Sequence, residues 1–184
     1  IGAGIYLLIL GISSFQYSQH WENSETFWTQ SIEQYPDHFY PYLGRGKYRT
    51  NQQQTALARE DIQASIDLND QHWESWYIGG IIMERENNPR GALDAYSLAI
   101  SHGGPVQSAY LNRGILRARN GEDLAGAYAD FNAAIELSPN YALAWLNRGL
   151  IAKMQEDFPK ALQDYNQAIQ LEPWNPQFYR NRAI

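Results

Sequence analysis

The sequence predicts an all-α fold of antiparallel helix pairs, and three observations lead to that prediction. A unit of 34 residues recurs along most of the chain. Each unit carries a helical stripe in which alanine, a larger apolar residue, a small residue and isoleucine stand at i, i+4, i+7 and i+8. Turn residues, such as Asn88-Pro89 and Asn120-Gly121, separate this stripe from an earlier helical segment. Each unit is therefore expected to hold two short helices.

Aligning the chain with itself gives the repeat frame. Four full copies occupy residues 39–72, 73–106, 107–141 and 142–175, and the third has 35 residues because NGEDLAGA contains one extra residue. A half copy precedes them at residues 21–38, and the start of another follows at residues 176–184. An aromatic residue recurs at position 4 and glycine at position 8, where the missing side chain lets a ring approach the helix backbone.

The frame places each helix. First helices are expected near residues 39–51, 73–86, 106–119 and 142–154, second helices near 55–68, 90–102, 124–137 and 158–171, and a further pair within 1–34. The proline at the end of a copy closes its second helix. The aromatic residues of the stripes should be mostly buried because they face glycine and alanine, and this applies to Trp76, Tyr96, Trp145 and Tyr165.

The pattern resembles the tetratricopeptide repeat (TPR) over nearly the whole chain from residue 21 on. It departs from the family pattern at Asp70 and Gly104, which replace the terminal proline in two copies. The resemblance implies a right-handed TPR solenoid of antiparallel helix pairs. It also implies a concave groove that holds a peptide or another protein.

Two charged positions vary together. Position 7 is arginine and position 23 is aspartate in the first, third and fourth copies, whereas the second copy has Gly79 and Ala95. Position 7 should face the second helix, where an unpaired guanidinium would be costly, so an ion pair is expected inside each of these repeats. The alternative is coincidence among four copies. The predicted pairs are Arg45 with Asp61, Arg113 with Asp130, and Arg148 with Asp164.

The resemblance also implies which residues line the groove, since the family builds it from first-helix positions 2, 5, 6, 9, 12 and 13. Apolar side chains should anchor an extended or helical segment, and the asparagines should hydrogen-bond its backbone. The alternative is that the leucines pack between first helices as core. Position 2 lacks lysine and arginine, which disfavours a clamp for a C-terminal carboxylate. The predicted groove residues are Leu43, Tyr77, Ile81, Leu111, Asn112, Ile115, Arg119, Leu146, Asn147, Leu150, Lys153 and Asn181.

The chain begins with an uncharged run, IGAGIYLLILGISSF, and no lysine or arginine precedes Arg45. A helix of this length spans about 22 Å, short of the roughly 30 Å of a bilayer core. We expect residues 1–20 to be the end of a transmembrane segment, with the repeats on the non-cytoplasmic side. The alternatives are that residues 5–18 are the buried first helix of the half copy and that the protein is cytoplasmic.

The junction WENSETFWTQSIEQYP, after the apolar run, resembles the C-terminal repeat region of polytopic membrane proteins related to glycosyltransferases, including O-mannosyltransferase-like proteins. That resemblance covers only residues 1–36. In such proteins the catalytic carboxylates lie in loops near the membrane core, and nothing here corresponds to them. The chain is therefore not expected to be an enzyme.

The composition argues against several classes of ligand. A net charge of −6 and a pI of about 5.1 argue against a nucleic-acid partner. Cysteine is absent and the four histidines do not converge, so neither a metal nor a cofactor is expected. The expected function is a protein-interaction scaffold that binds a peptide or protein and is tethered to a membrane. The alternatives are an accessory domain that positions the acceptor of a membrane glycosyltransferase, or a structural spacer. The C-terminal helix could also support self-association.

Overall fold

A computed structural model describes residues 25–121 and 123–183, and within these ranges the chain forms helices and no strands. The chain divides into two compact units, Ile1–Glu86 and Asn87–Ile184. The expected apolar helix within residues 1–20 lies outside the described residues.

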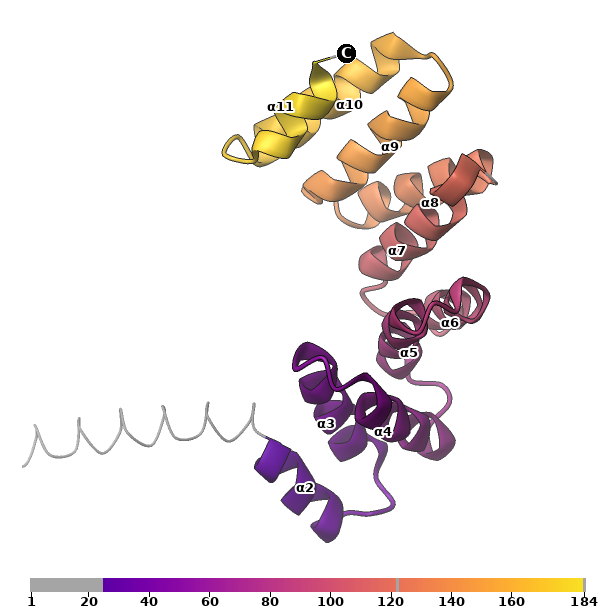
Figure 1. Cartoon of the computed structure of the whole chain (residues 1–184), viewed down its shortest axis with the longest axis vertical. Helices are drawn as coiled ribbons and strands as arrows, with labels where there is room; N and C mark the ends of the chain where they lie inside the picture. The colour runs from indigo at the N-terminus through magenta and orange to yellow at the C-terminus, as the bar shows by residue number, and fades with distance from the viewer. Residues whose placement is uncertain (1–24, 122, 184) are drawn as a thin grey trace, which may run out of the picture. The chain divides into compact units, whose positions relative to one another are not determined.

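Helices of the first unit are α2 (Glu25–Gln34), α3 (Phe39–Asn51), α4 (Thr55–Leu68) and α5 (Trp73–Arg85) (Figure 1). Those of the second unit are α6 (Pro89–Ser101), α7 (Gln107–Ala118), the short 3-10 helix η1 (Arg119–Gly121), α8 (Leu124–Leu137), α9 (Ala142–Met154), α10 (Phe158–Leu171) and α11 (Pro176–Arg182). The eight predicted repeat helices agree with these bounds to within one residue. The all-α fold class is confirmed, and α2 is the second helix of the predicted half copy.

The turn between the two helices of each repeat has one recurring conformation. The residue at repeat position 15 has a positive φ in every copy, at 61° for Gln53, 58° for Asn87, 74° for Gly121 and 60° for Glu156. This left-handed residue follows the first helix and ends it. In the three later copies an Asn or Asp side chain then accepts a backbone N–H of the second helix and caps it.

The second-helix stripes form the core of each unit. In the first unit Ala58 and Ile62 pack with Leu43, Ile78 and Ile82. In the second unit the stripe alanines and aromatic rings are all between 0% and 1% exposed, from Ala92 and Tyr96 through Phe131 to Tyr165 and Ala168. Burial of these side chains explains why the stripe recurs in the sequence. Apolar surface removed from water stabilises the fold by about 25 cal/mol per Å².

Close packing of ring on backbone explains the glycine at position 8. A Cβ added to Gly149 would lie 2.8 Å from the ring of Tyr165. Tyr96 and Tyr165 are fully buried, as predicted, whereas Trp76 and Trp145 are half-buried. Each indole keeps its edge at the surface because its Nε1–H donates to a carbonyl of the turn before its helix, at 2.6 Å for Trp76 and 2.8 Å for Trp145.

Ion pairs join the two helices of three repeats. An Nη atom of Arg45, Arg113 and Arg148 lies 2.7 Å from a carboxylate oxygen of Asp61, Asp130 and Asp164 respectively. The carboxylates are almost completely buried, and each also accepts the Nε–H of its arginine, so the contact has two parallel hydrogen bonds. Hydrogen bonding to the aspartate raises the pKa of Arg45 and Arg148 above its ordinary value.

The same arginines also connect neighbouring repeats, which the sequence did not predict. A third N–H of each guanidinium donates to a polar side chain 16 residues earlier, on the preceding second helix. The acceptors are Thr29 for Arg45 at 3.2 Å, Ser97 for Arg113 at 3.0 Å and Asn132 for Arg148 at 2.6 Å. Each arginine therefore fixes one first helix against two second helices.

Candidate functional site

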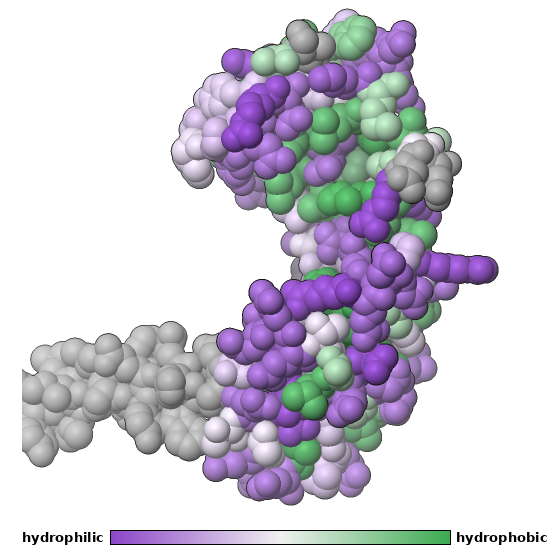
Figure 2. Space-filling model, viewed as in Figure 1, coloured by the Kyte–Doolittle hydropathy of each residue, from purple (hydrophilic) through white to green (hydrophobic). Residues whose placement is uncertain are grey.

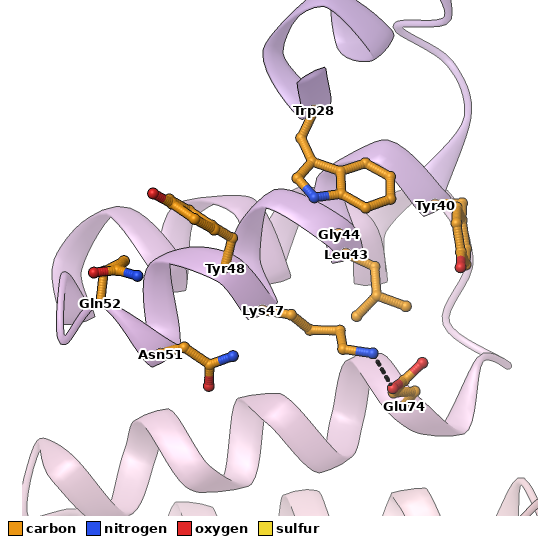
Figure 3. A pocket seen from close by; sticks show the side chains of 9 residues that line it. All are labelled: Trp28, Tyr40, Leu43, Gly44, Lys47, Tyr48, Asn51, Gln52 and Glu74. Carbon is orange, nitrogen blue, oxygen red and sulfur yellow. Dashed lines mark hydrogen bonds and ion pairs between the residues drawn. The ribbon is translucent and has the colours of Figure 1, made fainter. Parts of the chain in front are cut away.

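The first unit has a groove on the predicted face, between α3 and α5 and beside the first turn of α2 (Figure 3). Its volume is about 310 Å³. Most of its lining residues come from α3, at the positions from which the resemblance builds the groove. The lining of this α3–α5 groove is Trp28, Tyr40, Leu43, Gly44, Lys47, Tyr48, Asn51, Gln52 and Glu74.

Aromatic rings form one end of the α3–α5 groove, and an ion pair crosses it. Trp28 lies directly over Gly44, where an added Cβ would come 2.5 Å from the indole ring. The Trp28 and Tyr40 rings meet edge to face with centroids 6.0 Å apart. Lys47 extends across the groove to Glu74, and their charged atoms are 2.5 Å apart (Figure 3). The lysine of this groove therefore already has its counter-charge within the protein.

The second unit has a groove between α7 and α9, also of about 310 Å³, and its lining is mostly apolar. Figure 2 shows apolar residues gathered on the second unit around α9. Two large apolar side chains of the groove are exposed to solvent, Ile115 at 38% and Met154 at 55%. The lining of this α7–α9 groove is Ile115, Ala118, Arg119, Phe131, Asn147, Leu150, Ile151 and Met154.

The structure brings four predicted groove residues together, since Ile115, Arg119, Asn147 and Leu150 all line the α7–α9 groove. It corrects the prediction for the leucines at position 5. Leu111 and Leu146 are 4% and 2% exposed and belong to the core clusters of the second unit. Each packs with residues of the following repeat, so it holds first helices together and offers nothing to a ligand. Leu43 is 1% exposed and forms only the floor of the α3–α5 groove.

The remaining predicted residues lie outside both grooves. Tyr77 and Ile81 are half-buried and pack against the core of the first unit. Asn112, Lys153 and Asn181 are half-buried on first helices of the second unit.

Each asparagine of the predicted ladder donates one amide hydrogen to a group within the protein. Asn112 donates to the Tyr96 hydroxyl at 3.3 Å, whereas Asn147 and Asn181 each donate to a carbonyl one turn earlier in their own helix, at 2.7 and 3.0 Å. Their side-chain oxygens are the groups that can accept an N–H from a bound backbone. Of the three residues, Asn147 lines the α7–α9 groove.

Sequence reasoning missed Met154 and Trp28. Met154 occupies position 13, the same repeat position as the predicted Arg119, so the repeat frame was sufficient to predict it as a groove residue. Trp28 belongs to the half copy, and its place in a groove depends on the helix entry angle, which periodicity does not give.

Comparison with known proteins supports the repeat assignment. Residues 142–175 match the family model described as "Tetratricopeptide repeat". The described part of the chain folds as a TPR protein. Comparison with curated protein sequences gives no significant match.

Solved TPR structures share this fold at low sequence identity. YrrB, described as "a TPR protein with an unusual peptide-binding site", is 20% identical with a TM-score of 0.72, over 94% of this chain and 88% of YrrB. MamA is 19% identical with a TM-score of 0.73, over 86% of this chain and 92% of MamA. PilF of Pseudomonas aeruginosa is 14% identical with a TM-score of 0.80, over 94% of this chain and 78% of PilF. These likenesses establish the fold.

Within residues 25–121 and 123–183, no cluster of three His, Asp or Glu side chains has the arrangement to hold a metal ion. No helix in these ranges combines the length and apolarity needed to cross a bilayer.

Proposed function

We propose that this protein is a non-catalytic scaffold that binds a segment of a partner protein in the α7–α9 groove. One observation carries the proposal: Ile115 and Met154 leave a large part of their apolar surface in water on either side of a hollow of about 310 Å³. A bulky apolar side chain of a partner would fill that hollow, and its burial would contribute about 1.5–3 kcal/mol.

The rest of the groove suits a peptide in an extended or helical conformation. The amide oxygen of Asn147 accepts a backbone N–H of the bound segment, and Leu150 forms the apolar wall against its anchor. Phe131, which is 1% exposed, forms only the floor of the groove. YrrB and its described peptide-binding site support a peptide as the ligand, since the two chains share their fold over most of their length.

The proposal includes membrane tethering through residues 1–20, with the repeats on the non-cytoplasmic side. The uncharged run at residues 1–15 and the lack of basic residues before Arg45 support it. The resemblance to glycosyltransferase-like proteins is not supported by the comparisons, so an accessory role beside such an enzyme stays a prediction.

A selection from random peptides tests the binding function. A phage-displayed library of random 12-residue peptides is panned on the chain, and the affinity of enriched peptides is then measured by fluorescence anisotropy. The groove variant is Ile115→Gln with Met154→Gln, which removes the exposed apolar groups without adding charge. We expect it to weaken binding at least tenfold while the helical circular dichroism and melting temperature stay unchanged.

A matched variant controls for the general loss of exposed apolar surface. Leu137 and Leu162 are 55% and 40% exposed on α8 and α10 and do not line the groove. Leu137→Gln with Leu162→Gln should leave the affinity unchanged. Equal affinities for the groove and control variants, or no enriched peptide at all, would show that the α7–α9 groove is not the binding site.

A further inference from the structure

We infer that the partner segment of the α7–α9 groove is acidic, with Asp or Glu next to its apolar anchor. This inference rests on the proposed function and specifies its ligand. It excludes a terminal-carboxylate clamp, because the counter-charge comes from side chains flanking the anchor.

The first evidence is the sign of the charges on the first helices of the second unit. α7, α9 and α11 contain arginine and lysine but no acidic residue, although the whole chain has a net charge of −6. Aspartates of the second helices form ion pairs with Arg113, Arg117 and Arg148 and neutralise their charges. Lys153 has no such partner: among the described residues, no carboxylate lies within ion-pair distance of it.

Lys153 is placed to act on the groove. It stands three residues after Leu150 and next to Met154 on α9, so these side chains share one face of the helix. Arg119 lines the groove itself and already has an interaction partner within the protein. An apolar anchor bound in the hollow would therefore have the Lys153 ammonium group near its edge.

The first unit shows what such a lysine binds when a carboxylate is near. Lys47 of α3 lies in the α3–α5 groove, and its ammonium group meets the Glu74 carboxylate of α5. Repeat position 9, which is Lys47 in α3, is Ile115 in α7, and position 2, which is Glu74 in α5, is Leu143 in α9, so the α7–α9 groove has neither member of this pair. A carboxylate that meets Lys153 would have to come from the ligand.

An acidic segment of a protein fits these features better than a phosphate polymer does. The groove is apolar at its centre and charged only at its edges, which matches a side-chain anchor with flanking carboxylates. Charges at the rim of an interface act mainly on the association rate and on partner choice, and screening by salt weakens them.

The test uses peptides selected on the chain and a charge-neutral version of each, in which Asp and Glu are replaced by Asn and Gln. The affinities of both versions are measured for the original chain, for Lys153→Glu and for Arg90→Glu. Arg90→Glu is the matched control because it makes the same charge change at an exposed position of the second helix α6.

We expect the selected peptides to be enriched in acidic residues beside the anchor and to lose about five- to tenfold in affinity when neutralised. Lys153→Glu should weaken binding of the acidic peptide by a similar factor and leave the neutral version unchanged, and Arg90→Glu should change neither. Peptides that depend on Ile115 and Met154 but show no acidic enrichment, or that bind equally well when neutralised, would overturn the inference and leave the proposed function standing. If no peptide depends on those two residues, the proposed function fails and the inference fails with it.

Discussion

Removal of the Arg148–Asp164 ion pair should have a cost that depends on whether one partner or both are removed. The Asp164 side chain is 1% exposed and that of Arg148 17%, with two parallel hydrogen bonds between them. Arg148→Ala leaves a buried carboxylate without its cation and should cost about 3–5 kcal/mol. Asp164→Ala leaves a partly solvated guanidinium that keeps its bond to Asn132, so we expect about 2–3 kcal/mol.

The double variant should cost much less than the sum of the single variants, because it leaves no unpaired charge. We expect a coupling free energy of about 2–3 kcal/mol. The second copy of the repeat, with Gly79 and Ala95, has lost both charges in the same way. Urea unfolding of the four proteins, followed by circular dichroism at 222 nm, gives the cycle. If the losses of unfolding free energy in the two single variants add up to the loss in the double variant within about 0.5 kcal/mol, the two charges do not stabilise each other and the reasoning is refuted.

Four smaller predictions concern packing, pH and a hydrogen bond. Gly149→Ala should lower the free energy of unfolding in urea by about 1–3 kcal/mol because its methyl group overlaps the Tyr165 ring. Gly79→Ala should raise it by about 0.5–1 kcal/mol, since the nearest side-chain atom lies 3.7 Å away. Burial lowers the pKa of His72, so its contribution is present above pH 6.5 and lost as the pH falls through the lowered value. His72→Gln should therefore reduce the fall in melting temperature between pH 7 and 5. Trp145→Phe loses the indole hydrogen bond and should cost about 1 kcal/mol in the same urea assay.

The sequence was sufficient for features that periodicity controls. Helix bounds followed from the 34-residue frame, because turn residues and the apolar stripe recur at fixed positions. The correlated loss of arginine and aspartate in the second copy was enough to predict which side chains pair. In each case one copy of the repeat informs the others, so a single chain carries several independent observations.

The sequence was insufficient where the same residue type serves two purposes. Leu111 and Ile115 are both apolar and lie one turn apart on α7, yet one is buried and the other is 38% exposed. The difference arises from contact with the following repeat, which no helical period describes. The bond from Arg148 to Asn132 was missed for a similar reason, because it joins different repeats and its acceptor varies among Thr, Ser and Asn.

The position of the Arg148 hydrogen bonds on α9 explains why groove residues can be substituted without unfolding the protein. An α-helix turns by about 100° per residue, so Arg148 and Leu150 point to nearly opposite sides of α9. The arginine side carries the bonds to α8 and α10, and the opposite side carries the groove. Exposed groove residues contribute little to those bonds, and surface substitutions of this kind usually change stability by less than about 0.5 kcal/mol. Loss of peptide binding in the Ile115→Gln and Met154→Gln variant would therefore report on recognition, because the helix pairs behind the groove remain joined by the same ion pairs.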